Sequence, residues 1–554
     1  MSESVRGRRV WVLILVLCVF GTAVVADEGH RHPAGERLGK VDFPVACSPP
    51  AQRTFTRGVA LLHSFGYEEA EKTFREAAAA DPSCAMAWWG VAMSLFHPVW
   101  ASANPSAAPA PAELARGREA VERAKAAEAR TERERDYVAA VEAFYADPGG
   151  VAYPARASAF EKAMEGVARR HPRDQEAQVF YALALLGVSS PTDKTFAAQK
   201  KAAALLNDVL PRAPEHPGVA HYLIHSFDYP ALAELALPAA RAYSKIAPSA
   251  PHALHMPSHI FTRLGLWDES AASNLASAAS AREHVARAHP GATSFDELHA
   301  EDYLAYAYLQ QAQDAKAGAI VERMARVGEL DASNFAAAYA LAAAPARYAL
   351  ERREWKEAAA LVTRPASFPW ARFPYAEALT HFARAVGGAR GGDLAAARDG
   401  LARLEAIHEA LVSARDGYWA DQVEIQRLAA AGWIARAGGR DDEAVRLLRA
   451  GADLEDGSEK HPVTPGPLLP AREQLADLLL ELGRAPEARA EYEATLAVAP
   501  GRFRSVSGAA RAAELAGERG AARARYAELD RLCARAEATR PELAAMRRYL
   551  AGRD

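Results

Sequence analysis

Residues 66–82, GYEEAEKTFREAAAADP, predict a short amphipathic helix that packs tightly against another helix. Small Ala70 and Ala77 let a neighbouring helix approach, and Phe74 fills the space between them. Pro82 ends the helix, because it lacks a backbone N–H and disfavours helical geometry in the residue before it. The stretch therefore indicates one member of a helical pair.

Copies of this frame recur along the chain. Strong copies occupy residues 264–278 and 482–500, with small residues and a large apolar residue at the same offsets. Weaker copies begin near Ala358, Ala444 and Ala522. Recurrence at a period of about 34 residues is typical of helical repeat proteins, in which each unit packs only on its neighbours.

The frame resembles the second helix of the tetratricopeptide (TPR) repeat, and the resemblance covers most of the chain after the N-terminal segment. It implies an all-α fold, namely a right-handed α-solenoid of TPR-like helix-turn-helix repeats. Two features depart from the TPR pattern. Most copies lack the first-helix tryptophan, and the spacing is irregular between residues 100 and 215.

The composition also favours an all-α fold. Half of the 554 residues are hydrophobic and 25% are charged, whereas aromatic residues make up only 8%. Much of the apolar content is alanine, which suits closely packed helices better than sheets. The formal net charge is −4 and basic residues alternate with acidic ones, so no basic stripe predicts a nucleic-acid partner.

The N-terminus has the features of a secretory signal peptide. Arg8 and Arg9 precede an apolar stretch at residues 10–25, and small residues lead up to Ala26. The stretch has about 16 residues, fewer than the ~20 that span a bilayer. We therefore expect cleavage after Ala26, export to the periplasm or the extracellular space, and no integral membrane segment after cleavage.

Interruptions in the pattern predict the domain organisation. Residues 27–50 predict an extended N-terminal tail, and residues 51–385 an N-terminal TPR-like array. Four glycines in residues 386–392 predict a boundary before a C-terminal array at residues 393–554.

The cysteines leave two alternatives open. In an oxidising compartment Cys47 and Cys84 can form a disulfide that ties the tail to the array. Otherwise they remain two half-buried thiols. In either case Cys533 has no partner.

A histidine-rich segment at residues 215–267 provides the main sign of a functional site. It holds five of the 17 histidines: His221, His225, His252, His255 and His259. The first two are spaced i, i+4 and the other three i, i+3, i+7, so each set shares one helix face. Pro257 must kink or divide the second helix. Because one helix separates the two sets, we expect all five on adjacent first helices, lining the concave groove of the solenoid.

Imidazole nitrogen is a borderline ligand, so the five histidines are candidate ligands for Zn, Cu or Ni. Asp228 is placed to orient one of them. His63 and His97, in an earlier repeat, are predicted to face the same groove. The alternative is that the histidines only hydrogen-bond backbone or carboxylate groups at helix interfaces.

A second polar cluster at residues 296–302 contains His299 among four acids. Acids at a helix N-terminus favour the helix dipole, so this cluster is interpreted as helix capping.

Two functions follow from these patterns. The preferred hypothesis is an exported scaffold that binds a protein or peptide partner in its groove, with a histidine-bound transition metal as an additional feature. The alternative is a metal-dependent hydrolase centred on residues 221–259, although the chain lacks a His-Glu-x-x-His motif. Residues 221–230 and 252–267 also resemble exported bacterial TPR proteins of uncharacterised function, which implies a fold and export but no activity.

Overall fold

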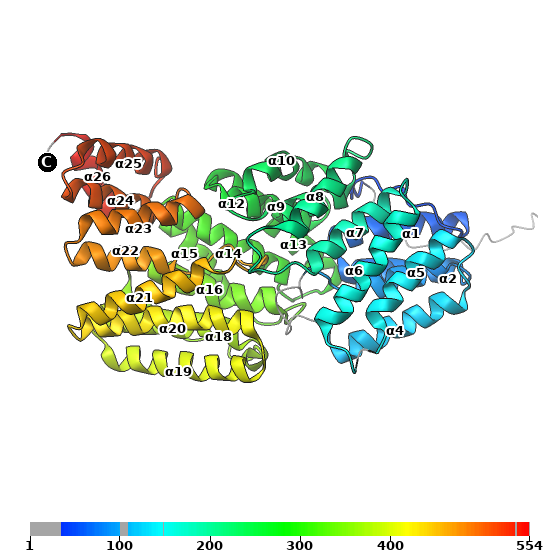
Figure 1. Ribbon diagram of the computed structural model, residues 1–554, viewed down its shortest axis with the longest axis horizontal. Helices are drawn as coiled ribbons and strands as arrows, with labels where there is room; N and C mark the ends of the chain where they lie inside the picture. The colour runs from blue at the N-terminus through cyan, green and yellow to red at the C-terminus, as the bar shows by residue number, and fades with distance from the viewer. Residues whose placement is uncertain (1–34, 100–108, 148, 538–539, 553–554) are drawn as a thin grey trace, which may run out of the picture. The chain divides into compact units, whose positions relative to one another are not determined.

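The computed structural model describes residues 35–99, 109–147, 149–537 and 540–552 (Figure 1). The chain divides into two compact units, residues 1–36 and residues 37–554, and the second unit contains all of the described helices. The predicted signal peptide, with His30 and His32 after it, lies outside the described residues. None of the described helices is long and apolar enough to serve as a membrane span.

The first half of the second unit contains the helices α1 (Pro49–His63), α2 (Tyr67–Ala80), α3 (Ala85–Ser94), α4 (Pro111–Ala126), α5 (Glu132–Tyr145), α6 (Tyr153–Arg170), α7 (Gln175–Gly187), α8 (Ala197–Val209), α9 (Pro217–Phe227), the 3₁₀ helix η2 (Ala233–Ala236), α10 (Leu237–Ile246), α11 (Pro251–His255), α12 (Pro257–Arg263) and α13 (Trp267–Ala288). The second half contains α14 (Phe295–Gln310), α15 (Asp314–Met324), α16 (Phe335–Glu351), α17 (Trp355–Ala359), the 3₁₀ helix η3 (Trp370–Arg372), α18 (Pro374–Gly391), α19 (Leu394–Ser413), α20 (Gly417–Ala437), α21 (Asp441–Asp456), α22 (Ala471–Glu481), α23 (Ala485–Val498), α24 (Phe503–Leu515), α25 (Arg519–Leu532) and α26 (Pro541–Leu550).

Consecutive helices pack as pairs, for example α1 with α2, α18 with α19 and α20 with α21 (Figure 1). No strand forms among the described residues, where an isolated bridge joins Thr293 to Leu330. The predicted fold class, an all-α, right-handed α-solenoid of TPR-like helix-turn-helix repeats, is confirmed.

The first repeat shows how the sequence frame produces this packing. Phe74 on α2 is fully buried, as are Ala70 and Ala77. A Cβ atom built on Gly58 of α1 or Gly90 of α3 would come within 2.7 or 2.3 Å of the Phe74 ring. The large aromatic residue of the frame therefore requires glycine on both neighbouring helices, because a real Cβ would clash with the ring.

The four glycines of residues 386–392 do not mark the boundary between two arrays that the sequence predicts. Helix α18 continues to Gly391, and only Gly392 beyond it adopts a positive φ. A Cβ built on Gly388 would lie 2.6 Å from the backbone nitrogen of Ala397 and 2.6 Å from the carbonyl oxygen of Asp393. The glycines therefore serve close helix packing rather than flexibility, and residues 37–554 form one unit across this point.

Substitution of Gly388 by alanine is expected to destabilise the protein by about 1–3 kcal/mol, because the new methyl group meets backbone that cannot rotate away. Gly520 is a matched control on α25, since a Cβ atom built there would meet nothing within 4 Å. There alanine is expected to stabilise by about 0.5–1 kcal/mol through helix propensity. Chemical denaturation of both variants measures the difference, and equal effects would contradict the close-packing interpretation.

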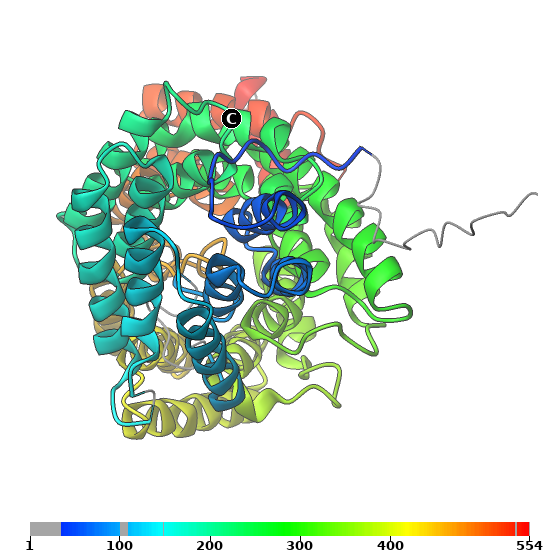
Figure 2. The same ribbon diagram turned by 90° about the vertical axis from the view of Figure 1, so that its right-hand side faces the viewer.

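The segment before α1 is extended and tied to the array, as Figure 2 shows in blue beside the green helices. The backbone N–H of Lys40 donates to the carbonyl of Glu215, and that of Ser249 donates to the carbonyl of Arg37. Phe43 is 1% exposed and packs its ring against Trp89. This part of the predicted tail thus lies against the array, with Leu38 and Phe43 buried.

Cys47 and Cys84 form a disulfide that joins the end of this segment to the start of α3. Of the two alternatives that the sequence left open, the structure therefore has the bridge. Cys533 is free and buried, as expected.

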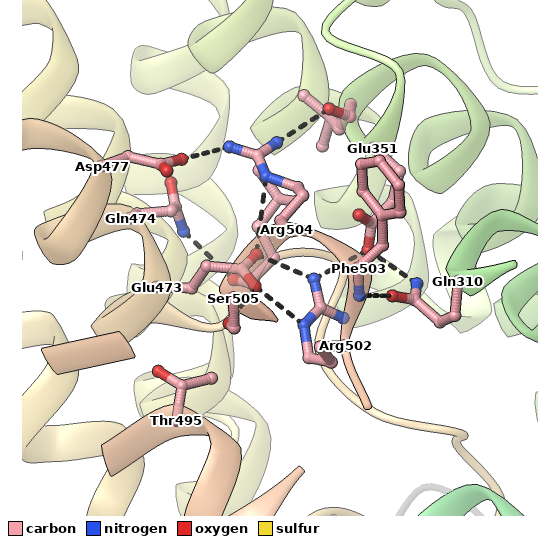
Figure 3. Close-up of polar contacts among 12 residues, drawn as sticks. Gln310, Glu351, Glu473, Gln474, Asp477, Thr495, Arg502, Phe503, Arg504 and Ser505 are labelled. Carbon is pink, nitrogen blue, oxygen red and sulfur yellow. Dashed lines mark hydrogen bonds and ion pairs between the residues drawn. The ribbon is translucent and has the colours of Figure 1, made fainter. Parts of the chain in front are cut away.

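A buried ion network attaches α24 to α16 and α22 (Figure 3). Arg502 is fully buried and donates to Glu473 at 2.8 and 3.0 Å and to Glu351 at 2.8 Å. Arg504 pairs with Asp477 in the same network. Because these acids come from helices far apart in the sequence, the network fixes how distant repeats dock.

Residues 457–470, the connection between α21 and α22, reach back to the N-terminal repeats. The backbone N–H of Glu459 donates to the carbonyl of Pro191 at 2.9 Å, and its side chain pairs with Lys194 at 2.8 Å. Lys460 donates to Asp228 at 2.9 Å, at the end of α9. We call this connection the inner loop.

Candidate metal centre

Six histidines meet in the interior, on consecutive first helices of three repeats. They are His221 and His225 on α9, His252 and His255 on α11, His259 on α12, and His299 on α14. As predicted, Pro257 divides the second histidine helix, with α11 ending before it and α12 beginning at it. All six side chains are buried, the most exposed being His252 at 9%.

The six form two groups of three. The first triad is His221, His225 and His252, and the second triad is His255, His259 and His299. Within each triad one ring nitrogen per residue lies within 4.8 Å of the others. The triads adjoin, since the ring centroids of His225 and His259 lie 6.3 Å apart and those of His252 and His255 lie 6.1 Å apart.

Hydrogen bonds around the second triad leave two lone pairs facing each other. His255 Nδ1 lies 2.7 Å from Asn274 Oδ1, and the amide NH₂ of Asn274 donates elsewhere, to the carbonyl of Ser270. His259 Nδ1 lies 3.1 Å from Asp228 Oδ2. Because both partners are acceptors, each neutral ring carries its proton on Nδ1. The two Nε2 atoms, 3.0 Å apart, therefore have no proton between them.

The first triad brings three Nε2 atoms together, and hydrogen bonding fixes the tautomer of His221. His221 Nδ1 lies 2.6 Å from the carbonyl oxygen of His63 and donates its proton there. Its Nε2 lone pair then faces Nε2 of His225 at 3.1 Å and Nε2 of His252 at 3.2 Å. Two nitrogens bound to one metal ion at about 2.0–2.1 Å are themselves about 3 Å apart. The first triad and the His255–His259 pair thus have the nitrogen spacing of metal ligands, and a ring nitrogen of His299 lies within 4.8 Å of that pair.

Burial keeps these imidazoles neutral, which is the form that binds metals. It lowers the pKa of His225 to about 3 and that of His299 to about 3, and nearby histidines add to the effect. Burial also holds the pKa values of His221, His252 and His255 well below the ordinary value. The six residues are therefore six uncharged nitrogen donors near neutral pH.

Asp228 orients His259, as predicted from its position, but it also pairs with two cations. Arg263 Nε donates to Asp228 Oδ1 at 2.9 Å, and Lys460 of the inner loop donates to Oδ2 at 2.9 Å. Burial alone would raise the pKa of Asp228, yet Lys460 and Arg263 hold it well below the usual range. The carboxylate is therefore ionised and engaged on both oxygens.

His63 does not join either triad and instead supports the first one. Its ring bonds Tyr222 at 3.0 Å and Glu176 at 2.9 Å, while Glu176 also bonds His216 at 2.9 Å. Burial would raise the pKa of Glu176, but His216 and His63 lower it to about 2. This network fixes the His63 carbonyl that receives the His221 proton.

His97, the other groove residue predicted from the sequence, lies apart from the six. Its half-buried ring packs on Tyr67 with centroids 4.3 Å apart. His97 has a positive φ of 51° and lies in the turn that follows α3. The structure therefore does not bring His97 into the centre.

Sequence reasoning missed His299 and Lys460. His299 was interpreted as part of a capping cluster, but it lies in the second turn of α14 with its ring 4.2 Å from that of His255. The repeat pattern could have identified His299, because α14 is the first helix of the repeat that follows the one carrying His255 and His259. No local signal marks Lys460, which arrives from a loop more than two hundred residues away along the chain.

The centre is closed rather than open to a groove. A cavity of about 20 Å³ beside the centre is lined by His225, Asp228, Lys460 and Pro462 together with Val99, Leu186, Ser189 and Tyr229. That volume holds about one water molecule. The expectation that the histidines line an accessible concave groove is corrected, because the inner loop lies against them.

A larger cavity of about 90 Å³ lies along the inner loop, with walls from Tyr339, Phe382, Tyr418 and Trp419. Lys460 lines both cavities. The inner loop thus separates the histidine centre from the larger space.

Comparison with known proteins finds only distant similarity to solved structures. No family model matches the sequence, and no curated protein matches it. The chain is similar to a solved human IFIT1 dimer with m7Gppp-AAAA at 11% identity and a TM-score of 0.38, over 77% of this chain and 87% of that one. A human IFIT1 dimer with PPP-AAAA gives 12% identity and a TM-score of 0.37, over 88% of this chain and 92% of that one. Naa15/Naa10 bound to HypK-THB gives 12% identity and a TM-score of 0.22, over 91% of this chain and 74% of that one. Scores this low carry no argument about ligands.

Proposed function

We propose that this protein is a metalloprotein in which a helical-repeat scaffold holds two transition-metal ions, one on each histidine triad. The observation that carries the proposal is the pair of Nε2 atoms of His255 and His259, 3.0 Å apart with both protons directed away to acceptors. Two buried lone pairs in this position repel each other unless a cation lies between them.

The donor set narrows the choice of metal. Three imidazole nitrogens suit copper, zinc or nickel, and copper binds most tightly among the divalent ions of the first transition row. The outer hydrogen bonds to His63, Asn274 and Asp228 resemble those that orient histidine ligands in metal sites generally. Three protein ligands also leave a coordination position for an exogenous ligand.

The hydrolase alternative receives less support. Hydrolysis at zinc benefits from a carboxylate free to take a proton from bound water. Asp228, the acid predicted to orient a histidine, is held by His259, Arg263 and Lys460. The 20 Å³ cavity beside it also has no room for a peptide or ester.

Metal content tests the proposal. The chain, purified without an affinity tag or chelator and incubated with copper or zinc, is expected to retain about two equivalents by elemental analysis. His221→Ala and His255→Ala are each expected to lose about one equivalent while keeping the helical circular dichroism of the parent. His408→Ala on α19 is the matched control and is expected to keep both ions.

Three results would contradict the proposal. These are no retained metal after reconstitution, a single equivalent that either triad variant abolishes, and variants that bind as much metal as the parent chain.

The other predictions from the sequence stay proposals. A protein or peptide partner would use a surface of the scaffold other than the buried histidines, and no basic stripe favours nucleic acid. Export after cleavage at Ala26 agrees with the Cys47–Cys84 disulfide, which is typical of oxidising compartments. Mass spectrometry of the N-terminus and fractionation of cells test the export prediction.

A further inference from the structure

The charge balance of the histidine centre limits its chemistry. Imidazole binds a metal in its neutral form, and Asp228, the carboxylate in contact with His259, is offset by Arg263 and Lys460. Two divalent ions would add four positive charges to a buried site without an anionic ligand, which is costly in a low-dielectric interior. Two cuprous ions add only two, so this neutral ligand set favours copper(I).

Oxidation of such a pair needs an anion to enter with it. Dioxygen meets this requirement, because it takes up two electrons to become the peroxide dianion. Two copper(II) ions with one peroxide carry a net charge of two, as do two copper(I) ions before the reaction. The buried site therefore keeps its total charge through the reaction, and the surrounding groups need not compensate.

The two triads are joined closely enough to act together. Helix α11 carries His252 of the first triad and His255 of the second triad on one short segment. The ring centroids across the boundary lie 6.1 and 6.3 Å apart. The two triads are therefore neighbours, and three protein ligands would leave each ion an open coordination position for a small ligand.

Access to the centre selects for small ligands. The adjoining cavity of about 20 Å³ admits one molecule of the size of water, and apolar Val99, Leu186 and Pro462 form part of its wall. His225 is the triad residue that lines this cavity, so a molecule as small as dioxygen reaches the centre there. The cavity excludes organic substrates from direct contact with the ions while the inner loop is in place.

We propose that the two histidine triads form a coupled pair of copper sites that binds dioxygen. Each copper(I) gives one electron, the O–O π* orbital receives both, and dioxygen becomes peroxide bound to two copper(II) ions. The O–O single bond remains, no proton moves, and release of dioxygen returns both electrons to copper. This inference rests on the proposed function, because it needs one ion on each triad.

Dioxygen uptake by the copper-loaded full chain tests the inference. The chain is loaded with copper(I) under anaerobic conditions, its copper content is measured, and oxygen is then added in a sealed electrode cell. We expect one dioxygen taken up per two bound coppers. We also expect no electron paramagnetic resonance signal from the oxidised protein, because the spins of two bridged copper(II) ions cancel. The zinc-loaded chain is the control and should take up no dioxygen, since zinc does not change oxidation state.

His252→Ala separates a coupled pair from two independent ions. Loss of one ion should abolish the uptake of one dioxygen per two coppers. The remaining copper, once oxidised to copper(II), should then give the full electron paramagnetic resonance signal of an isolated ion. Retained helical circular dichroism shows that the variant folds.

The possible failures can be told apart. Absence of bound copper and zinc would overturn the proposed function itself. Two bound coppers with no dioxygen uptake, or with uptake followed by the full signal of isolated copper(II), would overturn the inference and leave the metal sites standing.

Discussion

Arg502→Met is expected to lower the free energy of unfolding by about 3–5 kcal/mol, because it removes the closest cation from two buried carboxylates and leaves Glu473 only Arg504 at 3.6 Å. Arg502 is fully buried and binds Glu351 and Glu473, and it also donates to the hydroxyl of Tyr306 at 2.8 Å. Methionine fills a similar volume but offers no donor. Chemical denaturation followed by circular dichroism measures the loss.

A charge-matched variant tests whether uncompensated charge is the cause. Adding Glu351→Gln and Glu473→Gln to Arg502→Met removes both charges and should recover a large part of the stability. Arg511→Met is the surface control, since Arg511 pairs with Glu514 three residues along α24 and is half exposed. Loss of this surface pair should lower the free energy of unfolding by less than about 0.5 kcal/mol. Equal losses in Arg502→Met and the triple variant would show that packing, rather than charge, sets the effect.

Asp228→Asn is expected to weaken metal binding at the second triad by about ten- to a hundredfold. Asparagine keeps the size of the side chain but removes the charge that holds the Nδ1 proton of His259 at 3.1 Å. It also leaves Arg263 and Lys460 buried beside a neutral group, so we expect a loss of stability of about 3 kcal/mol as well. Competition with a chelator of known affinity measures the metal effect.

The first triad provides the internal reference for this experiment. No contact joins Asp228 directly to His221, whose Nδ1 proton goes to the carbonyl of His63, so the first ion should keep its affinity. Asp193→Asn on an exposed turn is the matched control and should change neither ion. If the second ion binds Asp228→Asn as tightly as the parent chain, then metal binding by His259 does not depend on the charge of Asp228.

The repeat frame was predictable because its physical basis is local. A Phe74 flanked by Ala70 and Ala77 and ended by Pro82 specifies a helix that must pack on another, whatever the rest of the chain does. The same reasoning failed at residues 386–392. Glycine in sequence indicates flexibility or close approach equally well, and only the backbone atoms of α19 lying against Gly388 decide between them.

For the centre, helix periodicity was enough to group the histidines within each segment. The i, i+4 spacing placed His221 and His225 on one face, and the position of Asp228 after them suggested its orienting role. The grouping into two triads was not predictable, since His252 joins the α9 histidines while His255, one turn later, joins His299 on α14. Which ring meets which depends on how the helices cross.

The helical repeats, the closely packed alanine-rich core and the faces on which five of the six histidines lie were predictable, because they follow from spacing along one chain segment. Long-range packing was needed to show that the histidines form two triads with His299 as the sixth member, that Lys460 of the inner loop lies against Asp228, and that Arg502 ties α24 to α16 and α22. The reason is that these contacts join residues far apart in sequence, and their energy depends on burial and distance, which no local pattern encodes.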